Sequence, residues 1–562
     1  MVFSDLTGLV HRFSLARTAW LILCFAAAAW AQVEIVPLDD QSIYPDSIAP
    51  DALAFVCAED RSALGSYFSE REVPFEDALV RPWQGRRDCH IYYEPTIQGF
   101  RVSRDNAAIR GLYAAVHPMH FLAHSDMPGY NLDIAKTILG RLPRPITVRI
   151  SVAGDFDKEF WAPAAESHFG GMPHDFTFVE SGSLEMHPWA QDHIKGGQAG
   201  GEPREMIPRR LYEGREEDGE LTAGLLDKLE QDGFVRSKLS WEGGGLQFVA
   251  TPRDKSKTIM SVGLLRYWGK DLTDAEYNYV LRTEFGADLV LNLNPTALHS
   301  DYVVAFLPES DTALVSQIIR TSAEVARPAA FALLDSFGEE KPPQVRRLAS
   351  LLAEWSGSLA DRPLSIQRAI QGARQEIHRA KPEQDAELDG MIERYVAEHC
   401  PGNPAVCFGA ANEMLRKDPE LARRSSSYAL GLTAESLLRE MLIGIVEDQL
   451  DTSVLPEQPL LEEAVGQLTE WGFRVVRVPH LSSGGVLRVS YVNSLPVGRR
   501  LFMPTLGLGR FEERMFTRLT SELAGQYEII PVDARRVLML NGGLHCVFGI
   551  LRDVEPASRP VR

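Results

Sequence analysis

Residues 257–295 read KTIMSVGLLRYWGKDLTDAEYNYVLRTEFGADLVLNLNP, with two β-like apolar segments on either side of a helix-like one. Comparable short strand-like segments, such as ITVRISVAG and HSDYVVAFLP, occur between about residues 145 and 317. Strands that alternate with helices are typical of an α/β domain. The sequence therefore predicts an α/β fold here.

The pattern becomes helical at about residue 318, with segments such as RRLASLLAEWSGSL and AESLLREMLIGIVEDQL. Strand-like segments return at residue 456. We therefore predict one catalytic domain made of residues 145–317 and 456–562, with an all-helical block, 318–455, inserted into it. Residues 32–144 are predicted to form an N-terminal appendage.

The first 31 residues have the features of a secretory leader. Arg12 and Arg17 precede an apolar stretch that ends in Ala29-Trp30-Ala31. This stretch holds about a dozen residues, whereas a membrane-spanning helix needs about 20. We expect cleavage after Ala31 and a secreted or periplasmic protein with no further membrane association. A retained membrane helix is the alternative.

The cysteines also point to an exported protein. Cleavage would remove Cys24 and leave five cysteines, an odd number that suggests one free thiol. Pairing neighbours in the sequence joins Cys57 to Cys89 and Cys400 to Cys407. Spacing does not prove this pairing, but it leaves Cys546 single and makes it the candidate nucleophile.

Composition and motifs exclude several classes of function. The chain has 562 residues, 45% of them hydrophobic, and a formal net charge of −19, which argues against a nucleic-acid partner. Signatures for dinucleotide binding (Gly-x-Gly-x-x-Gly), phosphate binding (the Walker loop), zinc proteases (His-Glu-x-x-His), dithiol redox sites (Cys-x-x-Cys) and serine hydrolases (Gly-x-Ser-x-Gly) are absent from the sequence.

Four short polar segments remain in this β-rich context, and together they offer a thiol, an imidazole and three carboxylates. They are HPWAQDH with Asp192, SWEGGGLQF with Glu242, LHSDYVVAF with His299 and Asp301, and NGGLHC with Cys546.

This set of groups suits attack on a guanidinium carbon. A guanidinium stays protonated, so its pocket needs carboxylates, and Asp192 and Asp301 can accept its N–H groups. Cys546 can attack the planar carbon as a thiolate. His299, oriented by Glu242, can protonate the departing amine and then deprotonate the attacking water. The expected partner is a small guanidino compound or the arginine side chain of a protein.

The order of these motifs resembles the pentein, or guanidino-group-modifying, superfamily. Trp-x-x-Asp is followed by Glu-Gly-Gly, His-x-Asp-x-x-x-x-Phe and Gly-Gly-x-His-Cys, an order most similar to agmatine deiminases and bacterial peptidylarginine deiminases. SYVNSLPVGRRLFMPTLG is similar to the strand pair that these enzymes carry before the nucleophile. The resemblance covers roughly residues 145–317 and 456–552.

The resemblance implies a role for each residue: Cys546 as nucleophile, His299 as general acid and base, Glu242 as its carboxylate partner, and Asp192 with Asp301 as the guanidinium clamp. It also implies a five-fold pseudosymmetric α/β propeller of ββαβ units, without metal or cofactor. Arginine, peptidyl-arginine and agmatine are the candidate substrates.

The sequence departs from the family pattern in three places. Gln191 stands where the family usually has arginine, the Asp-Gly that usually follows Glu-Gly-Gly is missing, and CVFGIL replaces a polar Cys-x-Thr ending. These departures leave the substrate open.

Alternative functions also stay open. An amidinotransferase would share the covalent intermediate, and a catalytically silent protein of the same fold would only bind a partner. A zinc hydrolase could use His117, His120 and His124, although Pro118 interrupts a helix there. Each predicted site residue could also be purely structural, for example Cys546 as a small buried hydrophobic residue.

Overall fold

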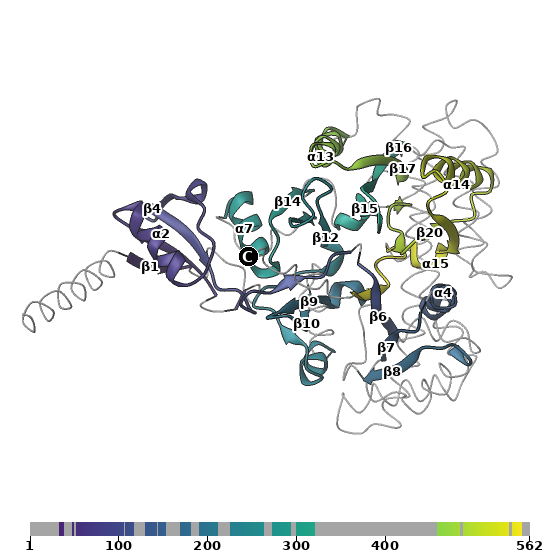
Figure 1. The fold of residues 1–562 in the computed structure, drawn as a ribbon, viewed down its shortest axis with the longest axis horizontal. Coiled ribbons are helices and arrows are strands. Elements are labelled where there is room, and N and C mark those ends of the chain that lie inside the picture. Colours follow the sequence, from purple (N-terminus) through teal and green to yellow (C-terminus); the bar gives the residue numbers. More distant parts are fainter. Residues whose placement is uncertain are drawn as a thin grey trace, which may run out of the picture. The chain divides into compact units, whose positions relative to one another are not determined.

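The protein is described by a computed structural model (Figure 1). The described residues are 33–38, 48–49, 52–105, 107–116, 130–142, 144–152, 169–180, 190–211, 225–263, 272–293, 299–320, 458–483, 487–538 and 542–552. The predicted leader lies outside these ranges, as do Cys400, Cys407 and nearly all of the predicted helical block. Within the described residues, no helix is both long and apolar enough to cross a membrane.

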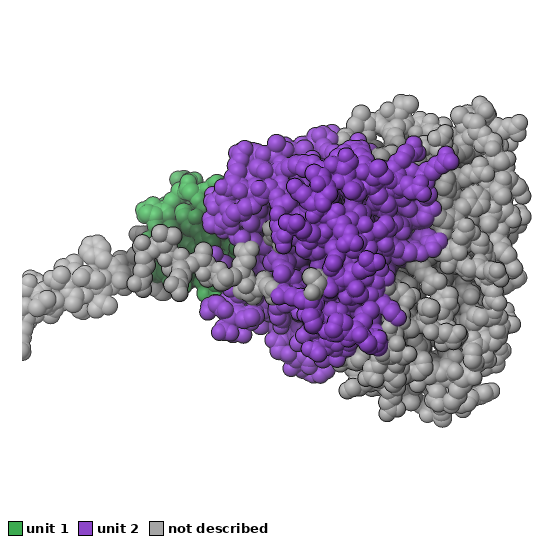
Figure 2. All heavy atoms as spheres, turned by 45° about the vertical axis from the view of Figure 1, so that its right-hand side comes forward, with its two compact units in different colours: residues 1–100, 238–240, 266–286 green, residues 101–237, 241–265, 287–562 purple. Residues whose placement is uncertain are grey.

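The chain divides into two compact units (Figure 2). Unit 1 comprises Met1–Phe100, Lys238–Ser240 and Arg266–Gly286; the remaining residues form unit 2. This division differs from the predicted one, which ended the N-terminal appendage at residue 144. The reason is strand pairing, because the strand Ile109–Val116 joins a sheet of unit 2.

Unit 1 contains a four-stranded antiparallel sheet in the order β1-β2-β4-β3. Its elements are β1 (Val33–Pro37), β2 (Leu53–Ala58), α2 (Arg61–Glu70), η1 (Asp77–Leu79), β3 (Arg81–Trp83) and β4 (Arg86–Tyr93). Cys57 and Cys89 stand opposite each other in the β2–β4 register and form a disulfide. The predicted Cys57–Cys89 pair is therefore confirmed.

The predicted helix between two strands is also present, as α7 (Asp274–Phe285) in unit 1. It begins at a capping box, in which Thr273 and Glu276 satisfy each other's backbone N–H groups. It ends at Gly286, whose φ of 66° favours glycine.

Five sheets make up the described part of unit 2. In each, one strand pairs antiparallel with a second strand, which pairs parallel with a third; these triplets are β22-β6-β7, β9-β10-β11, β12-β13-β14, β15-β16-β17 and β19-β20-β21. The additional strands β5 (Arg101–Val102), β8 (Asp175–Glu180) and β18 (Leu487–Ser490) extend three of the sheets.

The triplet strands are β6 (Ile109–Val116), β7 (Thr147–Val152), β9 (Lys195–Ala199), β10 (Glu202–Ile207), β11 (Val235–Arg236), β12 (Leu246–Ala250), β13 (Thr258–Val262), β14 (Leu289–Asn292), β15 (Val304–Phe306), β16 (Thr312–Arg320), β17 (Arg474–Ser483), β19 (Leu495–Val497), β20 (Arg500–Thr505), β21 (Glu528–Asp533) and β22 (Phe548–Arg552).

A helix precedes the third strand of each triplet. These helices are α4 (Tyr130–Leu139), residues 225–231, α7, α13 (Gln458–Glu470) and α14 (Arg510–Glu522); α15 (Arg535–Leu538) comes later. The order along the chain is thus the ββαβ unit that the resemblance implies, with β22 from the C-terminal region completing the triplet of β6. An α/β fold is confirmed, whereas the five-fold propeller and the all-helical insertion stay predictions.

Two pairings bring distant parts of the sequence together. β16 pairs in parallel with β17 from Thr312 to Arg320, so the predicted insertion would begin after this strand and not at residue 318. β22 pairs antiparallel with β6, so a strand near the C-terminus completes the sheet of an early strand. The second pairing holds the segment that follows Cys546.

The main apolar core of unit 2 is shared by several of these sheets. It includes Leu112, Val148, Leu314, Phe502 and Val547, all at most 1% exposed. Cys546 belongs to the same cluster and is 3% exposed. The NGGLHC segment therefore ends against a packed interior, which restricts its movement.

Candidate active site

Cys546 lies in a turn directly before β22 and is the free cysteine of the described residues. The backbone N–H of Gln191 donates to the Cys546 carbonyl at 3.2 Å, and the N–H of Phe548 donates to the His545 carbonyl at 3.3 Å. These bonds hold the cysteine backbone from two sides. The thiol is therefore presented by a fixed turn.

Asp301 lies in a short 3-10 turn, η4 (Ser300–Tyr302), that leads into β15, and His299 directly precedes this turn. The Ser300 hydroxyl donates to the Gly244 carbonyl at 3.3 Å, and the Gln247 side chain donates to the Val304 carbonyl at 2.7 Å. The turn is thus tied to the neighbouring segment 244–247. Because His299 precedes the turn and Asp301 lies within it, one local structure positions both side chains.

Glu242 precedes a second 3-10 turn, η3 (Gly243–Gly245). Its Oε2 lies 2.8 Å from His299 Nε2, and both residues are buried. A Cβ atom on Gly244 would lie 2.5 Å from His299 Nδ1, so only glycine leaves room for the imidazole. The Glu-Gly-Gly motif therefore supplies both the partner of His299 and the space for its ring.

Asp192 lies in a third 3-10 turn, η2 (Ala190–His193), and is 1% exposed. The backbone N–H of Gly244 donates to Asp192 Oδ1 at 2.7 Å. One carboxylate oxygen each of Asp192 and Glu242 and one ring nitrogen of His299 all lie within 4.8 Å of one another.

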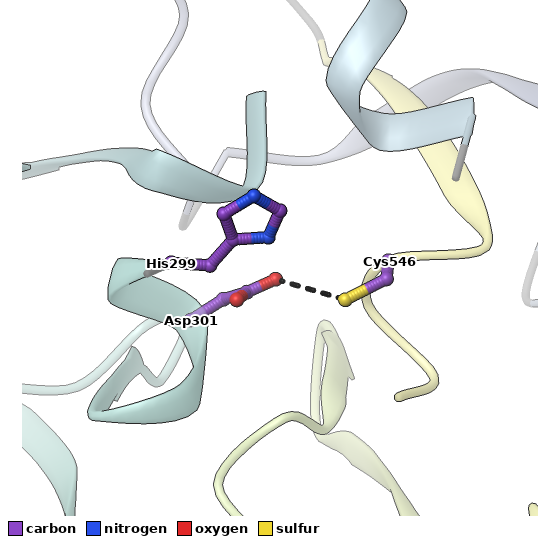
Figure 3. A group of neighbouring side chains, drawn as sticks. All are labelled: His299, Asp301 and Cys546. Carbon is purple, nitrogen blue, oxygen red and sulfur yellow. Dashed lines mark hydrogen bonds between the residues drawn. The ribbon is translucent and has the colours of Figure 1, made fainter. Parts of the chain in front are cut away.

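Asp301 links the histidine side of the site to the thiol (Figure 3). The Cys546 thiol donates to Asp301 Oδ2 at 3.6 Å, and atoms of His299, Asp301 and Cys546 lie within 4.8 Å of one another. His299 and Asp301 come from the η4 segment and Cys546 from the turn before β22, and the three side chains converge. The structure thus brings all five predicted site residues together, although their chemical roles stay predictions.

Three further side chains at the site received no role in the sequence analysis. His545 Nδ1 lies 3.2 Å from Asp301 Oδ2. The Gln191 amide oxygen accepts a hydrogen bond from His545 Nδ1 at 2.5 Å. In this orientation the Gln191 amide nitrogen donates to Asp301 Oδ2 at 2.9 Å. Asn493 donates to Cys546 Sγ at 3.2 Å. All three residues stand inside the quoted motifs, but only the folded chain reveals their contacts.

Burial and charge shift the two groups that would carry the chemistry. Burial acts to lower the pKa of His299. The charge of Asp192 and the hydrogen bonds to Cys546 and Glu242 outweigh burial, so the pKa of His299 is raised well above its usual value. Burial, followed by the charge of Asp301, raises the pKa of Cys546 to about 12, although His299 acts in the opposite direction. The site without substrate therefore favours a protonated imidazole beside a neutral thiol.

Two groups of three residues at the site contain residue types that bind metals, and both groups include His299. One group adds Asp192 and Glu242, and the other adds Asp301 and Cys546. The sequence predicts a site without metal, and this stays a prediction. The alternative zinc ligands His117, His120 and His124 lie outside the described residues.

Comparison with known proteins links the nucleophile segment to one family. Residues 450–548 match the Porphyromonas-type peptidyl-arginine deiminase family. Among solved structures, an agmatine deiminase of C. jejuni is 14% identical at a TM-score of 0.43, over 82% of this chain and 98% of that one. An agmatine deiminase of Enterococcus faecalis is 10% identical at a TM-score of 0.41, over 81% and 97% of the chains.

A protein of Porphyromonas gingivalis described as an arginine deiminase is 12% identical at a TM-score of 0.41, over 81% and 98% of the chains. The comparison with curated proteins gave no match. The segment that matches the family, 450–548, contains Asn493, His545 and Cys546. The expected resemblance is thus supported over residues 450–548, which match the Porphyromonas-type peptidyl-arginine deiminase family.

Proposed function

We propose that this protein is a deiminase that hydrolyses a guanidino substrate to the ureido product and ammonia. The observation that carries the proposal is the convergence of Cys546, His299 and Asp301 within 4.8 Å, with Asp192 and Glu242 in the overlapping cluster around His299. The family match over residues 450–548 supports the same reaction class.

Two buried carboxylates would bind the substrate. Asp192 and Asp301 are 1% and 2% exposed, and carboxylates buried without a cation are costly. Asp301 accepts hydrogen bonds at Oδ2, whereas its buried Oδ1 has no hydrogen-bond partner among the described residues. A guanidinium carries a permanent positive charge and several N–H donors in one plane, so it can satisfy this oxygen and neutralise the site.

Substrate binding would also activate the nucleophile. The pKa of Cys546 stands at about 12 in the site without substrate because burial and the Asp301 carboxylate disfavour a second negative charge. A guanidinium cation held beside the sulfur reverses that electrostatic balance and favours the thiolate. The nucleophile would thus form mainly when the correct cation is bound.

In the first half-reaction, the Cys546 thiol releases its proton to solvent as the guanidinium binds. The thiolate Sγ forms a bond to the guanidinium carbon, and the C=N π electrons move onto nitrogen. His299, held in its protonated form by Asp192 and Glu242, donates its proton to the leaving amino group. The C–N bond then breaks, ammonia leaves, and a covalent thiouronium remains on Cys546.

In the second half-reaction, the neutral His299 removes a proton from water as its oxygen attacks the thiouronium carbon. The C–S bond breaks, its electron pair returns to Cys546, the sulfur takes the hydroxyl proton of the intermediate, and the ureido product is released. His299 ends protonated, so the catalytic groups return to their starting states without a metal or cofactor.

Export and the propeller arrangement of the fold belong to the same proposal. The leader features of residues 1–31 support secretion or a periplasmic location, as does the Cys57–Cys89 disulfide, because disulfides persist mainly in oxidising compartments. The five repeated ββαβ units support a five-fold propeller. We expect peptidyl-arginine, free arginine or agmatine as the substrate.

The test is a screen of these three substrate types for ureido product and released ammonia with the purified mature protein. The Cys546→Ser variant is the matched control. Production of both products by the wild type but not by the variant would support the proposal. Transfer of the amidino group to an added amine without ammonia would favour an amidinotransferase instead, and no turnover of any guanidino compound would contradict an enzymatic role.

A further inference from the structure

A small cavity beside the nucleophile turn is lined by polar side chains to which the proposed mechanism gives no part. Its volume is about 20 Å³, and its walls include Ser103, Asp105, Lys195 and Arg552 as well as His545 from the nucleophile segment. A cavity needs about 10–15 Å³ to hold one water-sized particle. This cavity therefore has room for a single small ligand.

Arg552, the last residue of β22, brings unused hydrogen-bond donors to the cavity. It is 2% exposed, and its Nη1 donates to the Ala107 carbonyl at 2.9 Å. Its Nε and Nη2 atoms have no hydrogen-bond partner among the described residues. The Nε atom lies 3.7 Å from Asp105 Oδ1, which is beyond hydrogen-bond distance. A buried guanidinium with two unused nitrogen atoms needs a further acceptor.

Lys195, the first residue of β9, adds a second buried cation. It is 8% exposed, and its Nζ donates to the Leu246 carbonyl at 2.9 Å. An ammonium group has three N–H donors, so this bond leaves others unused. Burial lowers the pKa of Lys195 although Asp105 acts in the opposite direction, and burial also lowers the pKa of Arg552. An anion in the cavity would offset this cost of burying positive charge.

The remaining polar groups of the wall leave an excess of donors and of positive charge. Ser103 Oγ is buried and has no hydrogen-bond partner in the part of the chain that the structure describes. Asp105 supplies one carboxylate, but its Oδ2 already accepts from the backbone N–H of Phe248 at 2.7 Å. Asp192 and Asp301 also attract Lys195, yet neither lines the cavity. Two cations therefore face a single carboxylate across this small space.

We propose that this cavity is a binding site for one small monovalent anion of the halide class, held by Arg552, Lys195 and Ser103. A halide ion accepts hydrogen bonds and donates none, so it suits walls that offer N–H and O–H donors. Hydrogen bonds to an ionised acceptor are about twice as strong as those between neutral groups. Phosphate and carboxylate ions consist of several heavy atoms and exceed the room for one particle.

Such an ion would join three segments of unit 2, namely β9, β22 and the residues directly after β5. β22 follows the nucleophile turn, and His545, which also lines the cavity, places its Nδ1 3.2 Å from Asp301 Oδ2. The ion would therefore stabilise the strand that holds the Cys546 segment. This inference goes beyond the proposed function, and its test requires no turnover.

The test is thermal denaturation of the purified protein in sodium chloride and in sodium gluconate at the same sodium concentration. A ligand that binds only the folded state raises the midpoint as its concentration rises, whereas gluconate is too large for the cavity. We expect the midpoint to rise with chloride and to level off once the site is occupied. The concentration dependence gives the apparent Kd for chloride.

Three variants locate the effect. Lys195→Met keeps an unbranched side chain but removes one charge, and Ser103→Ala removes only the hydroxyl donor. Loss of a hydrogen bond to a charged group corresponds to about a 10- to 100-fold weaker chloride affinity, and we expect this loss in either variant. Lys255→Met removes an exposed lysine charge of unit 2 and is the matched control, which should keep the wild-type response.

A wild-type midpoint that depends on chloride no more than on gluconate would overturn the inference, because the cavity would then hold water only. An equal chloride response in Ser103→Ala, Lys195→Met and Lys255→Met would overturn it too, since the ion would bind elsewhere. If Lys195→Met does not fold, the milder Ser103→Ala variant decides. In crystals grown with sodium bromide, an anomalous peak between Arg552 and Lys195 would confirm the site, and bromide peaks only outside the cavity would contradict it.

Discussion

His299 Nε2 lies 2.8 Å from Glu242 Oε2, and neither side chain is more than 10% exposed. This pair couples two segments of unit 2, the Glu-Gly-Gly turn and the turn before β15. Because the folded-state pKa of His299 is raised, the pair stabilises the fold fully at pH values below the unfolded pKa, about 6.5. That stabilisation is lost as the pH rises through the raised folded pKa.

Glu242→Gln removes one of the negative charges that hold the proton on His299. We expect the alkaline limb of the kcat profile to move to lower pH, because the imidazole then loses its proton more readily. The measurement is kcat against pH for the wild type and the variant. Glu462→Gln, which changes an exposed carboxylate in α13, is the control and should leave the profile unchanged. An unmoved limb in Glu242→Gln would argue against this partnership.

Cys546→Ser should reduce ammonia release to background without unfolding the protein. The hydroxyl is of similar size, but it does not ionise near neutral pH and is a much weaker nucleophile. Thermal denaturation checks the fold, and an ammonia assay checks turnover. His124→Ala is predicted to leave the chemistry intact. A folded but inactive His124 variant together with an active Cys546→Ser variant would favour the zinc alternative, and metal analysis would then decide.

Asp192→Asn and Asp301→Asn each remove one negative charge from a buried site that must accept a cation. We expect kcat/KM to fall about 10²-fold or more in either variant, the scale for losing one partner of a buried charge pair. Steady-state kinetics over a range of substrate concentrations measures this loss. Asp227→Asn, at a surface position, should behave like the wild type. A clamp role is wrong for either residue whose variant keeps full kcat/KM.

Replacing both Cys57 and Cys89 by alanine should lower the stability of unit 1. Loss of a native disulfide from a small exported domain typically costs about 2–5 kcal/mol. The midpoint of urea denaturation, with and without reductant, measures the difference. All five predicted site residues belong to unit 2, so the fraction that remains folded should keep its turnover. A midpoint equal to that of the wild type would show that the crosslink contributes little.

Mass analysis of the exported protein tests its processing. The Ala29-Trp30-Ala31 ending predicts a mature N-terminus at Gln32. The same sample, denatured without reductant, should have one thiol open to alkylation, Cys546, and a Cys400–Cys407 disulfide. A retained leader would contradict both the cleavage site and the proposed location.

Much of the α/β framework could be predicted from local patterns. The alternation of short apolar segments with an amphipathic helix in residues 257–295 corresponds to β13, α7 and β14. The capping residues Thr273 and Gly286 lie at the two ends of α7 as helix-capping rules require. Hydrogen bonding and burial over a few residues are enough to determine such elements, so the sequence pattern carries the information.

The domain boundary could not be found in this way. β6 looks like part of the N-terminal appendage in the sequence, yet it pairs with β22, a strand about 440 residues later. Edge pairing between strands depends on which backbones meet after folding, and no local periodicity encodes it. The assignment of residues 101–144 to unit 2 is therefore a tertiary result.

For the site, the sequence alone determined which chemical groups were available: the thiol of Cys546, the imidazole of His299 and three carboxylates, each in a turn-forming context that keeps it out of regular secondary structure. Only the tertiary structure decided that Asp301 contacts the sulfur and that Asn493 donates to it from the turn after β18. Side-chain chemistry is a property of each residue and can be read position by position. Convergence is a property of several strands packed together, because contacts of 3 to 4 Å between residues more than 50 positions apart exist only once the sheets have formed.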